Sequence, residues 1–165
     1  MNFSRINILI IIFFLFCSLS ISIYFVGPTN FLIFNTDWLY GAGDPTNAQL
    51  SWQYFQKSDW YFPLGKNPDY GLELSNSIVF TDNIPLLAIF FKILSPLLSD
   101  KFQYFSFWIF ICLFLQLTLA YLILLKATQD NLFSLLSSFL FLLTPFLFFR
   151  LSLLFSLGAH WLILY

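Results

Sequence analysis

Long apolar runs alternate with one long polar stretch along this chain. The first apolar run covers residues 6–26, and two more cover residues 102–125 and 132–149. Each is close to the roughly 20 residues that a helix needs to cross the hydrocarbon core of a bilayer. A further apolar run occupies residues 151–165 and has no polar flank. The pattern predicts an all-α fold, a polytopic transmembrane helix bundle.

Residues 1–165 are predicted to form a single membrane domain that is incomplete at its C-terminal end. The last apolar run, 151–165, is short for a span, so we expect it to be the start of a further one. Arg5 precedes the first run and an acidic loop follows it, which predicts a cytoplasmic N-terminus by the positive-inside rule. We therefore expect a multi-pass protein of the cytoplasmic (inner) membrane.

The polar stretch, residues 27–101, is predicted to be a large extracytoplasmic first loop that contains short juxtamembrane helices. Six of the eight acidic residues and three of the five tryptophans fall between residues 37 and 82. Asp44 followed by Pro45 has the form of a helix start, with Asp as the N-cap and Pro at the first helical position. This predicts a short helix over residues 45–57 whose apolar side lies along the membrane surface.

The segment Ile84–Leu98 has two interpretations. It is apolar, but at about 15 residues it is short for a span. In the first interpretation it lies at the outer interface, with Lys92 reaching up to water. In the second it is a span, which reverses the orientation of everything after it and puts Arg150 in the cytoplasm. The first interpretation places the main ionisable residues on the outer face, namely Asp44, Asp82, Arg150 and His160.

Composition supports the membrane prediction and excludes several function classes. Only 9% of the residues are charged, against about 25% in soluble domains. The net charge of −1 gives no basic field for nucleic acid, so we expect no nucleic-acid partner. Cys17 and Cys112 both lie in apolar runs, without the spacing of a zinc site. The sequence contains no Ser/His/Asp pattern, Gly-rich phosphate loop or HExxH motif.

Three segments carry a resemblance to a known family: GAGDPTNAQLSWQYF, WYFPLGKNPDYGLELSNSIVFTDNIPLLAIFFKILSPLL and FQYFSFW. In this order they resemble a family of bacterial polytopic membrane proteins of unassigned function, from about residue 37 to the end of the chain. That family is similar in plan to the GT-C superfamily of glycosyltransferases, which includes oligosaccharyltransferases, protein O-mannosyltransferases and lipid A aminoarabinose transferases. The resemblance implies transfer of a sugar from a polyprenyl-phosphate donor on the outer face of the cytoplasmic membrane.

The same resemblance implies roles for individual residues. An acidic residue near the start of the first outer loop, which maps onto Asp44, acts as the catalytic base or as the ligand of a divalent cation, Mg²⁺ or Mn²⁺. Sugar transfer needs a base for the acceptor's proton and a cation for the departing phosphate. Related sequences often have a His a few residues after this Asp, whereas Asn47, Ala48 and Gln49 stand there in this chain. The expected substrate-binding residues are Asp37, Trp52, Lys66, Asp82, Arg150 and His160.

Simpler interpretations exist for each of these residues. Asp44 could serve only as an N-cap, and Asp82 could start the helix that follows it. Arg150 at the end of a span has the usual position of an interfacial anchor. A non-enzymatic membrane protein, such as a transporter or an assembly scaffold, is the alternative function, with the first loop binding a partner. Membrane lipid and a lipid-linked sugar donor are the expected partners, and the sequence does not predict an oligomeric state.

Overall fold

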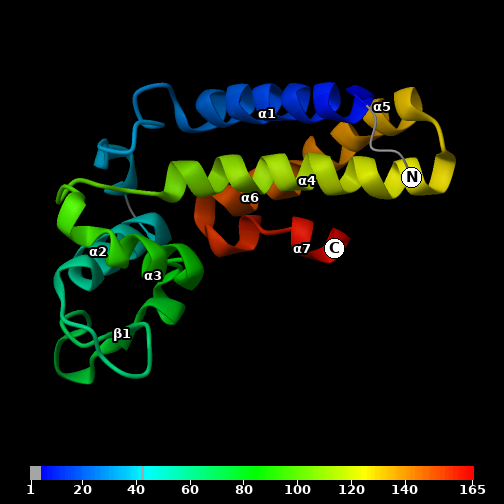
Figure 1. The fold of residues 1–165 in the computed structure, drawn as a ribbon. Coiled ribbons are helices and arrows are strands. Elements are labelled where there is room, and N and C mark those ends of the chain that lie inside the picture. Colours follow the sequence, from blue (N-terminus) through cyan, green and yellow to red (C-terminus); the bar gives the residue numbers. More distant parts are fainter. Residues whose placement is uncertain (1–4, 42) are drawn as a thin grey trace.

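The computed structural model describes residues 5–41 and 43–165, so residues 1–4 and 42 of the predicted membrane domain lie outside it. The described residues are mostly helical and contain seven α-helices. The two longest, α1 (Arg5–Val26) and α4 (Phe105–Thr128), lie side by side and run in opposite directions (Figure 1). Both are long and apolar enough to cross a membrane, as expected of helices that are hydrophobic on all sides.

The run predicted as one span over residues 132–149 is instead two helices. α5 (Asn131–Leu142) packs against α4, and α6 (Pro145–Leu153) follows after a bend of 44°. Pro145 explains the break, because proline cannot donate the helical hydrogen bond and its ring clashes with the preceding turn. Together α5 and α6 are long enough for a third, broken crossing.

Residues 151–165 do not continue as a regular span in the structure. α6 ends at Leu153, and a short 3₁₀ turn, η5 (Ser156–Gly158), leads to α7 (Trp161–Leu164), which packs against α4. Gly158 permits this fold-back, because a Cβ atom there would lie 2.1 Å from Leu151 Cδ2. The chain therefore turns back beside α6 instead of running on as a straight helix.

Residues 27–104 form a separate unit, here named the end unit, at the end of α1 and α4 where α1 finishes and α4 begins (Figure 1). The backbone N–H of Gln103 donates to Ile33 O (2.8 Å), which joins the two ends of this unit. β1 and β2 are antiparallel, with Lys66 opposite Ser77. In chain order its elements are η1 (Asp37–Leu39), α2 (Asp44–Lys57), β1 (Lys66–Asn67), η2 (Leu72–Leu74), β2 (Asn76–Ser77), η3 (Ile78–Thr81), α3 (Pro85–Ile93) and η4 (Ser95–Leu97).

The segment Ile84–Leu98 does not form a membrane span in the structure. Its helix α3 has nine residues and is followed only by η4, and the helices long enough to cross are elsewhere in the described chain. The prediction that Lys92 reaches water is wrong, because its side chain is only 3% exposed. Its ammonium donates to Ser58 Oγ (2.9 Å) and Asp59 O (3.0 Å), and it lies 4.0 Å from the centre of the Phe55 ring. Lys92 therefore joins α3 to the end of α2.

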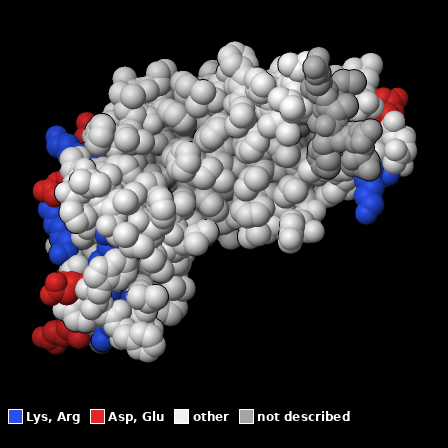
Figure 2. Space-filling view, viewed as in Figure 1, with Lys and Arg blue, Asp and Glu red and all other residues white. Residues whose placement is uncertain are grey.

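The surface of α3 that faces away from the end unit is apolar. Large side chains at spacings of three or four residues are exposed there, and the row continues into η4: Leu86, Phe90 and Ile93 of α3 and Leu97 of η4. On the face shown in Figure 2, charged side chains gather at the two extremities of the molecule, and the broad surface between them carries none. This distribution is typical of a protein whose middle is surrounded by lipid.

Candidate functional site

The candidate site lies where the end unit meets α6 and η5. Four of the predicted site residues lie near this meeting point: Asp44 and Asp82 in the end unit, Arg150 in α6, and His160 just after η5. The two segments that carry them, residues 44–82 and 150–160, are 68 positions apart in the chain. Hydrogen bonds from side chains to the backbone and aromatic packing hold the elements together at this point.

Asp44 is the first residue of α2. The prediction that it is the N-cap is off by one position: Gly43 is the N-cap, with φ of 84°, a conformation that favours glycine. The Thr46 hydroxyl donates to Leu39 O (2.8 Å), which fixes the start of α2 against η1. Asp44 is exposed, and no salt bridge to its carboxylate occurs among the described residues. Its carboxylate is therefore open to solvent and to a bound ligand.

Asp82 ties the end unit to the membrane helices. It follows η3 in a left-handed conformation with φ of 56°. Its carboxylate accepts hydrogen bonds from the backbone N–H groups of Phe155 and of Ser156 (2.9 Å for Ser156). Each oxygen thus accepts one protein hydrogen bond, and substrate binding by Asp82 stays a prediction. Ile84, not Asp82, is the N-cap of α3. The structure instead gives Asp82 the role of capping η5.

The pKa of Asp82 connects it with Asp44. Burial raises the pKa of Asp82 from its usual value, and hydrogen bonds from Ser156 and Phe155 offset part of this change. The negative charge of Asp44 raises the pKa of Asp82 further. The two carboxylates are therefore close enough to interact electrostatically, although 38 positions separate them in the sequence.

The turn that Asp82 holds is also fixed from the other side. Phe155 O accepts a hydrogen bond from Trp108 Nε1 of α4 (2.7 Å). The Phe155 ring stacks on Phe105, with 4.6 Å between the ring centres, and meets Trp38 edge to face at 6.1 Å. η5 is thus held between the end unit and α4.

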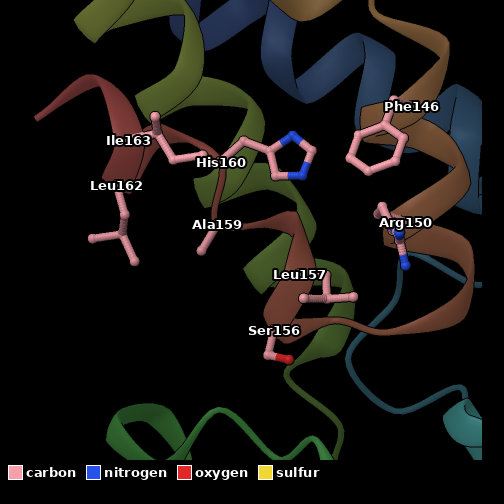
Figure 3. Close-up of a pocket in the computed structure, with 8 residues that line it drawn as sticks. All are labelled: Phe146, Arg150, Ser156, Leu157, Ala159, His160, Leu162 and Ile163. Carbon is pink, nitrogen blue, oxygen red and sulfur yellow. The ribbon is translucent and has the colours of Figure 1, made fainter.

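Arg150 and His160 lie in a groove between α6, η5 and α7 (Figure 3). The groove has a volume of about 480 Å³, and Ser156, whose amide binds Asp82, is one of its lining residues. The Arg150 guanidinium lies 4.7 Å from the centre of the Phe146 ring, and the His160 ring stacks on the same ring at 5.4 Å. The N–H groups of a guanidinium and of an imidazole ring are donors suited to phosphate oxygens. The groove could therefore hold an anionic group close to the Asp82 tie.

A second cavity, of about 250 Å³, lies beside the start of α2. Pro45, the residue after Asp44, lines it together with residues from the end of α1 and from α6. Trp38 also lines it, and the buried Trp38 Nε1 has no hydrogen-bond partner among the described residues. The full lining is Phe25, Val26, Trp38, Pro45, Leu151 and Ser152. This mainly apolar space lies where α1 ends and α2 begins, and Asp44 precedes its lining residue Pro45 in the sequence.

The other predicted site residues lie elsewhere. Trp52 is completely buried, donates from Nε1 to Phe102 O (3.1 Å) and packs edge to face on Tyr104. The prediction that its ring stacks on a sugar is therefore wrong, because Trp52 belongs to the core of the end unit. Asp37 is exposed at the start of η1, and Lys66 is exposed on β1. Among the described residues, no hydrogen bond or salt bridge brings either of them to Asp82 or Arg150.

The described side chains do not assemble a metal site. No group of three or more His, Cys, Asp or Glu side chains is placed to hold a metal ion in this part of the chain. Asp82 already accepts two backbone hydrogen bonds, which leaves Asp44 as the one predicted carboxylate ligand with open oxygens at this junction. One carboxylate alone does not fit a preformed Mg²⁺ or Mn²⁺ site.

Sequence reasoning missed the residues that complete the junction. Trp38, Phe146 and Ser156 were not singled out, because each is an ordinary residue within its own segment. Their importance comes from contacts across the fold, such as the Asp82–Ser156 bond between residues 74 positions apart. The apolar character around Phe146 was the only local signal, and it predicts burial in a membrane without indicating a groove.

Comparison with known protein families gives one match. Residues 15–165 match the family described as Domain of unknown function (DUF6311). No curated protein and no solved structure matches the chain. The matched range begins within α1 and includes the whole end unit, both cavities and all the site residues described above. The chain therefore belongs to the family that is defined by this domain of unknown function, DUF6311.

Proposed function

We propose that this chain is part of a GT-C-like glycosyltransferase that transfers a sugar from a polyprenyl-phosphate donor on the outer face of the cytoplasmic membrane. The observation that carries the proposal is the position of Asp44. Its carboxylate is exposed at the start of α2, one residue before Pro45, which lines an apolar cavity. Its charge also acts on Asp82, which holds the turn next to Arg150 and His160. The resemblance in plan to GT-C enzymes supports the same assignment.

The proposed membrane placement puts the end unit outside. α1, α4 and the α5–α6 pair cross the bilayer, the N-terminus is cytoplasmic, and α3 lies in the interface with its exposed apolar side chains in the lipid. Leu86 and Leu97 at the two ends of this surface are 79% and 86% exposed, which is costly in water and favourable in lipid. α6 returns towards the end unit, so Arg150 lies at the outer level together with Asp44.

The chemistry follows from this arrangement. Asp44 accepts the proton of the acceptor hydroxyl as that oxygen attacks the sugar carbon, and the bond from the sugar to the lipid phosphate breaks. Arg150 donates charge-assisted hydrogen bonds to the phosphate as its negative charge grows, and His160 can add a further donor. The apolar cavity beside Pro45 accommodates the part of the lipid chain next to the phosphate. Asp82 takes no part in bond making and keeps the groove in place.

The proposal is tested with the full-length protein in proteoliposomes. Transfer is measured from radiolabelled polyprenyl-phosphate mannose, glucose and arabinose to total membrane and soluble acceptors. Asp44→Asn removes the base and should lower the rate by about 10²- to 10⁴-fold. Glu73→Gln, which neutralises an exposed acid of η2 outside the site, is the matched control and should retain full activity. Undiminished transfer by Asp44→Asn would refute the assignment of Asp44.

Dependence on Mg²⁺ or Mn²⁺ stays a prediction from the resemblance. The same assay with EDTA tests it. Loss of transfer that either ion restores would support metal participation, and unchanged transfer would mean that Arg150 and His160 supply the positive charge. If no donor is used by the wild type, the alternative of a non-enzymatic protein that binds a partner through the end unit gains support.

A further inference from the structure

A second groove, about 490 Å³ in volume, lies on the outward side of α2. Its lining residues are Leu50, Gln53, Tyr54, Lys57, Ser58 and Asp69. Those from α2 are on the side opposite the buried residues Ala48, Trp52 and Phe55, so the groove opens away from the core of the end unit. Its volume is within the usual range for small-ligand sites, about 300–1,000 Å³.

Contacts between side chains lead from this groove towards the first turn of α2, where Asp44 lies. The Tyr54 ring meets the Tyr70 ring, with 5.6 Å between their centres. The Tyr70 hydroxyl donates to Asn47 Oδ1, and Asn47 is three residues after Asp44, on a neighbouring part of the helix surface. We name the row Tyr54–Tyr70–Asn47 the tyrosine row. At 1.5 Å per residue, the distance along α2 from Lys57 to Asp44 is roughly 20 Å, so a ligand that covers it must be extended.

The charges in the groove indicate a ligand without net charge. Lys57 and Asp69 have opposite signs, and Lys57 also pairs with Asp100 (3.0 Å) at the rim. The one lysine is therefore matched by carboxylates, so the groove has no positive field that would attract an anion. Gln53 and Ser58 add an amide and a hydroxyl, each of which can both donate and accept hydrogen bonds.

The aromatic and polar groups together suit a polyhydroxylated ring compound. Tyr54 is 49% exposed and offers part of a ring face beside these hydrogen-bonding groups. Peptides are usually recognised by an open strand edge or by an apolar groove for a helix. Here β1 and β2 have only two residues each and pair with one another, and the groove carries charged and amide groups. Sugars have both apolar ring faces and several hydroxyl groups, so they match this surface better than peptides do.

We propose that the outward groove of α2 binds a neutral glycan, several sugar units long, and directs its end along the tyrosine row towards Asp44. This glycan is the acceptor of the transfer reaction, and that statement rests on the proposed function. The binding itself does not depend on catalysis. Remote contacts of this kind would hold the acceptor in place, so that its terminal hydroxyl reaches the carboxylate.

Binding is tested with the full-length protein in fluorescent nanodiscs on a printed array of neutral and acidic microbial glycans. Tyr54→Ala removes the exposed ring and should weaken binding to the selected glycans by about tenfold or more. Tyr70→Phe keeps the ring and loses the bond to Asn47, so a smaller decrease is expected. Tyr61→Ala is the matched control, because Tyr61 is 40% exposed and is not among the residues that line the groove.

The outcomes separate the two proposals. Binding of neutral glycans that Tyr54→Ala weakens and Tyr61→Ala does not would support the groove. Absence of binding by the wild type, binding restricted to acidic glycans, or equal binding by Tyr54→Ala would overturn it. If glycans bind in the groove but no sugar is transferred, the proposed reaction fails and the glycan site stands. If transfer occurs without this binding, the acceptor reaches Asp44 by another route.

Discussion

The buried lysine of α3 should make the stability of this protein depend on pH in the alkaline range. Burial lowers the pKa of Lys92 from 10.5 to about 8, and the Asp59 and Asp69 carboxylates offset part of this change. Each pKa unit corresponds to about 1.4 kcal/mol, so burying the charged form costs about 3 kcal/mol. Between pH 8 and 10.5 the unfolded chain holds a proton that folded Lys92 has lost, so the free energy of unfolding rises with pH in this window.

Thermal melting of the purified protein in detergent micelles, followed from pH 7 to 10.5, measures this effect. Lys92→Met keeps an apolar side chain of similar length and should remove this contribution to the pH dependence. At pH 7 the variant should be at least as stable as the wild type, because the desolvation cost of the charge is gone. Lys57→Met is the control: Lys57 is 59% exposed, so its loss should leave the dependence unchanged. A Lys92→Met variant with the wild-type dependence would refute the reasoning.

Two further predictions concern the turn that carries the groove. Asp82→Ala removes the acceptor of the Phe155 and Ser156 amides, so hydrogen exchange at these two amides should become at least tenfold faster. Asp69→Ala is the control and should leave their exchange unchanged. Equal protection in both variants would contradict the hydrogen bonds from these amides to Asp82. Gly158→Ala places a Cβ atom 2.1 Å from Leu151 Cδ2 and should destabilise the protein by about 1–3 kcal/mol in a melting assay. Gly41→Ala, whose Cβ atom would meet no atom within 4 Å, should leave the stability unchanged. An unchanged melting temperature for Gly158→Ala would contradict the close packing of Gly158 on Leu151.

Much of the helical fold could be predicted from the sequence. Apolar runs of about 20 residues correspond to α1 and α4, because lipid-exposed helices need apolar residues on every side. The Asp-Pro pair at residues 44–45 marked the start of α2 to within one position. The short length of Ile84–Leu98 favoured a helix that does not cross, and α3 has only nine residues.

Other features could not be predicted, because they depend on contacts between distant segments. The burial of Trp52 depends on Phe102 and Tyr104, about 50 positions later. A lysine in an apolar helix is expected to extend its ammonium to water, but the Ser58 hydroxyl and the Asp59 backbone oxygen accept hydrogen bonds from Lys92 inside the end unit. Local patterns describe what a segment prefers, and such partners decide where its polar groups finally lie.

The candidate site, too, could be predicted from the sequence only in part. Asp44 was identified from its position and from the resemblance, and the structure places it at the junction of the end unit and the long helices. The contacts of Asp82 with the Phe155 and Ser156 amides could not be predicted, because these backbone groups are 73 and 74 residues away. Arg150 and His160 were both selected, but only the fold shows that they pack on one ring, that of Phe146.

The proposed reaction requires that the end unit and Arg150 lie on the same, outer side of the membrane. The most direct measurement is labelling of single cysteines with a membrane-impermeant maleimide on intact cells, in a background without Cys17 and Cys112. Cysteines at positions 100 and 150 should both react from outside, whereas one at position 130, at the opposite end of α4, should react only after permeabilisation. Reaction at position 150 only after permeabilisation, with position 100 open from outside, would contradict the account.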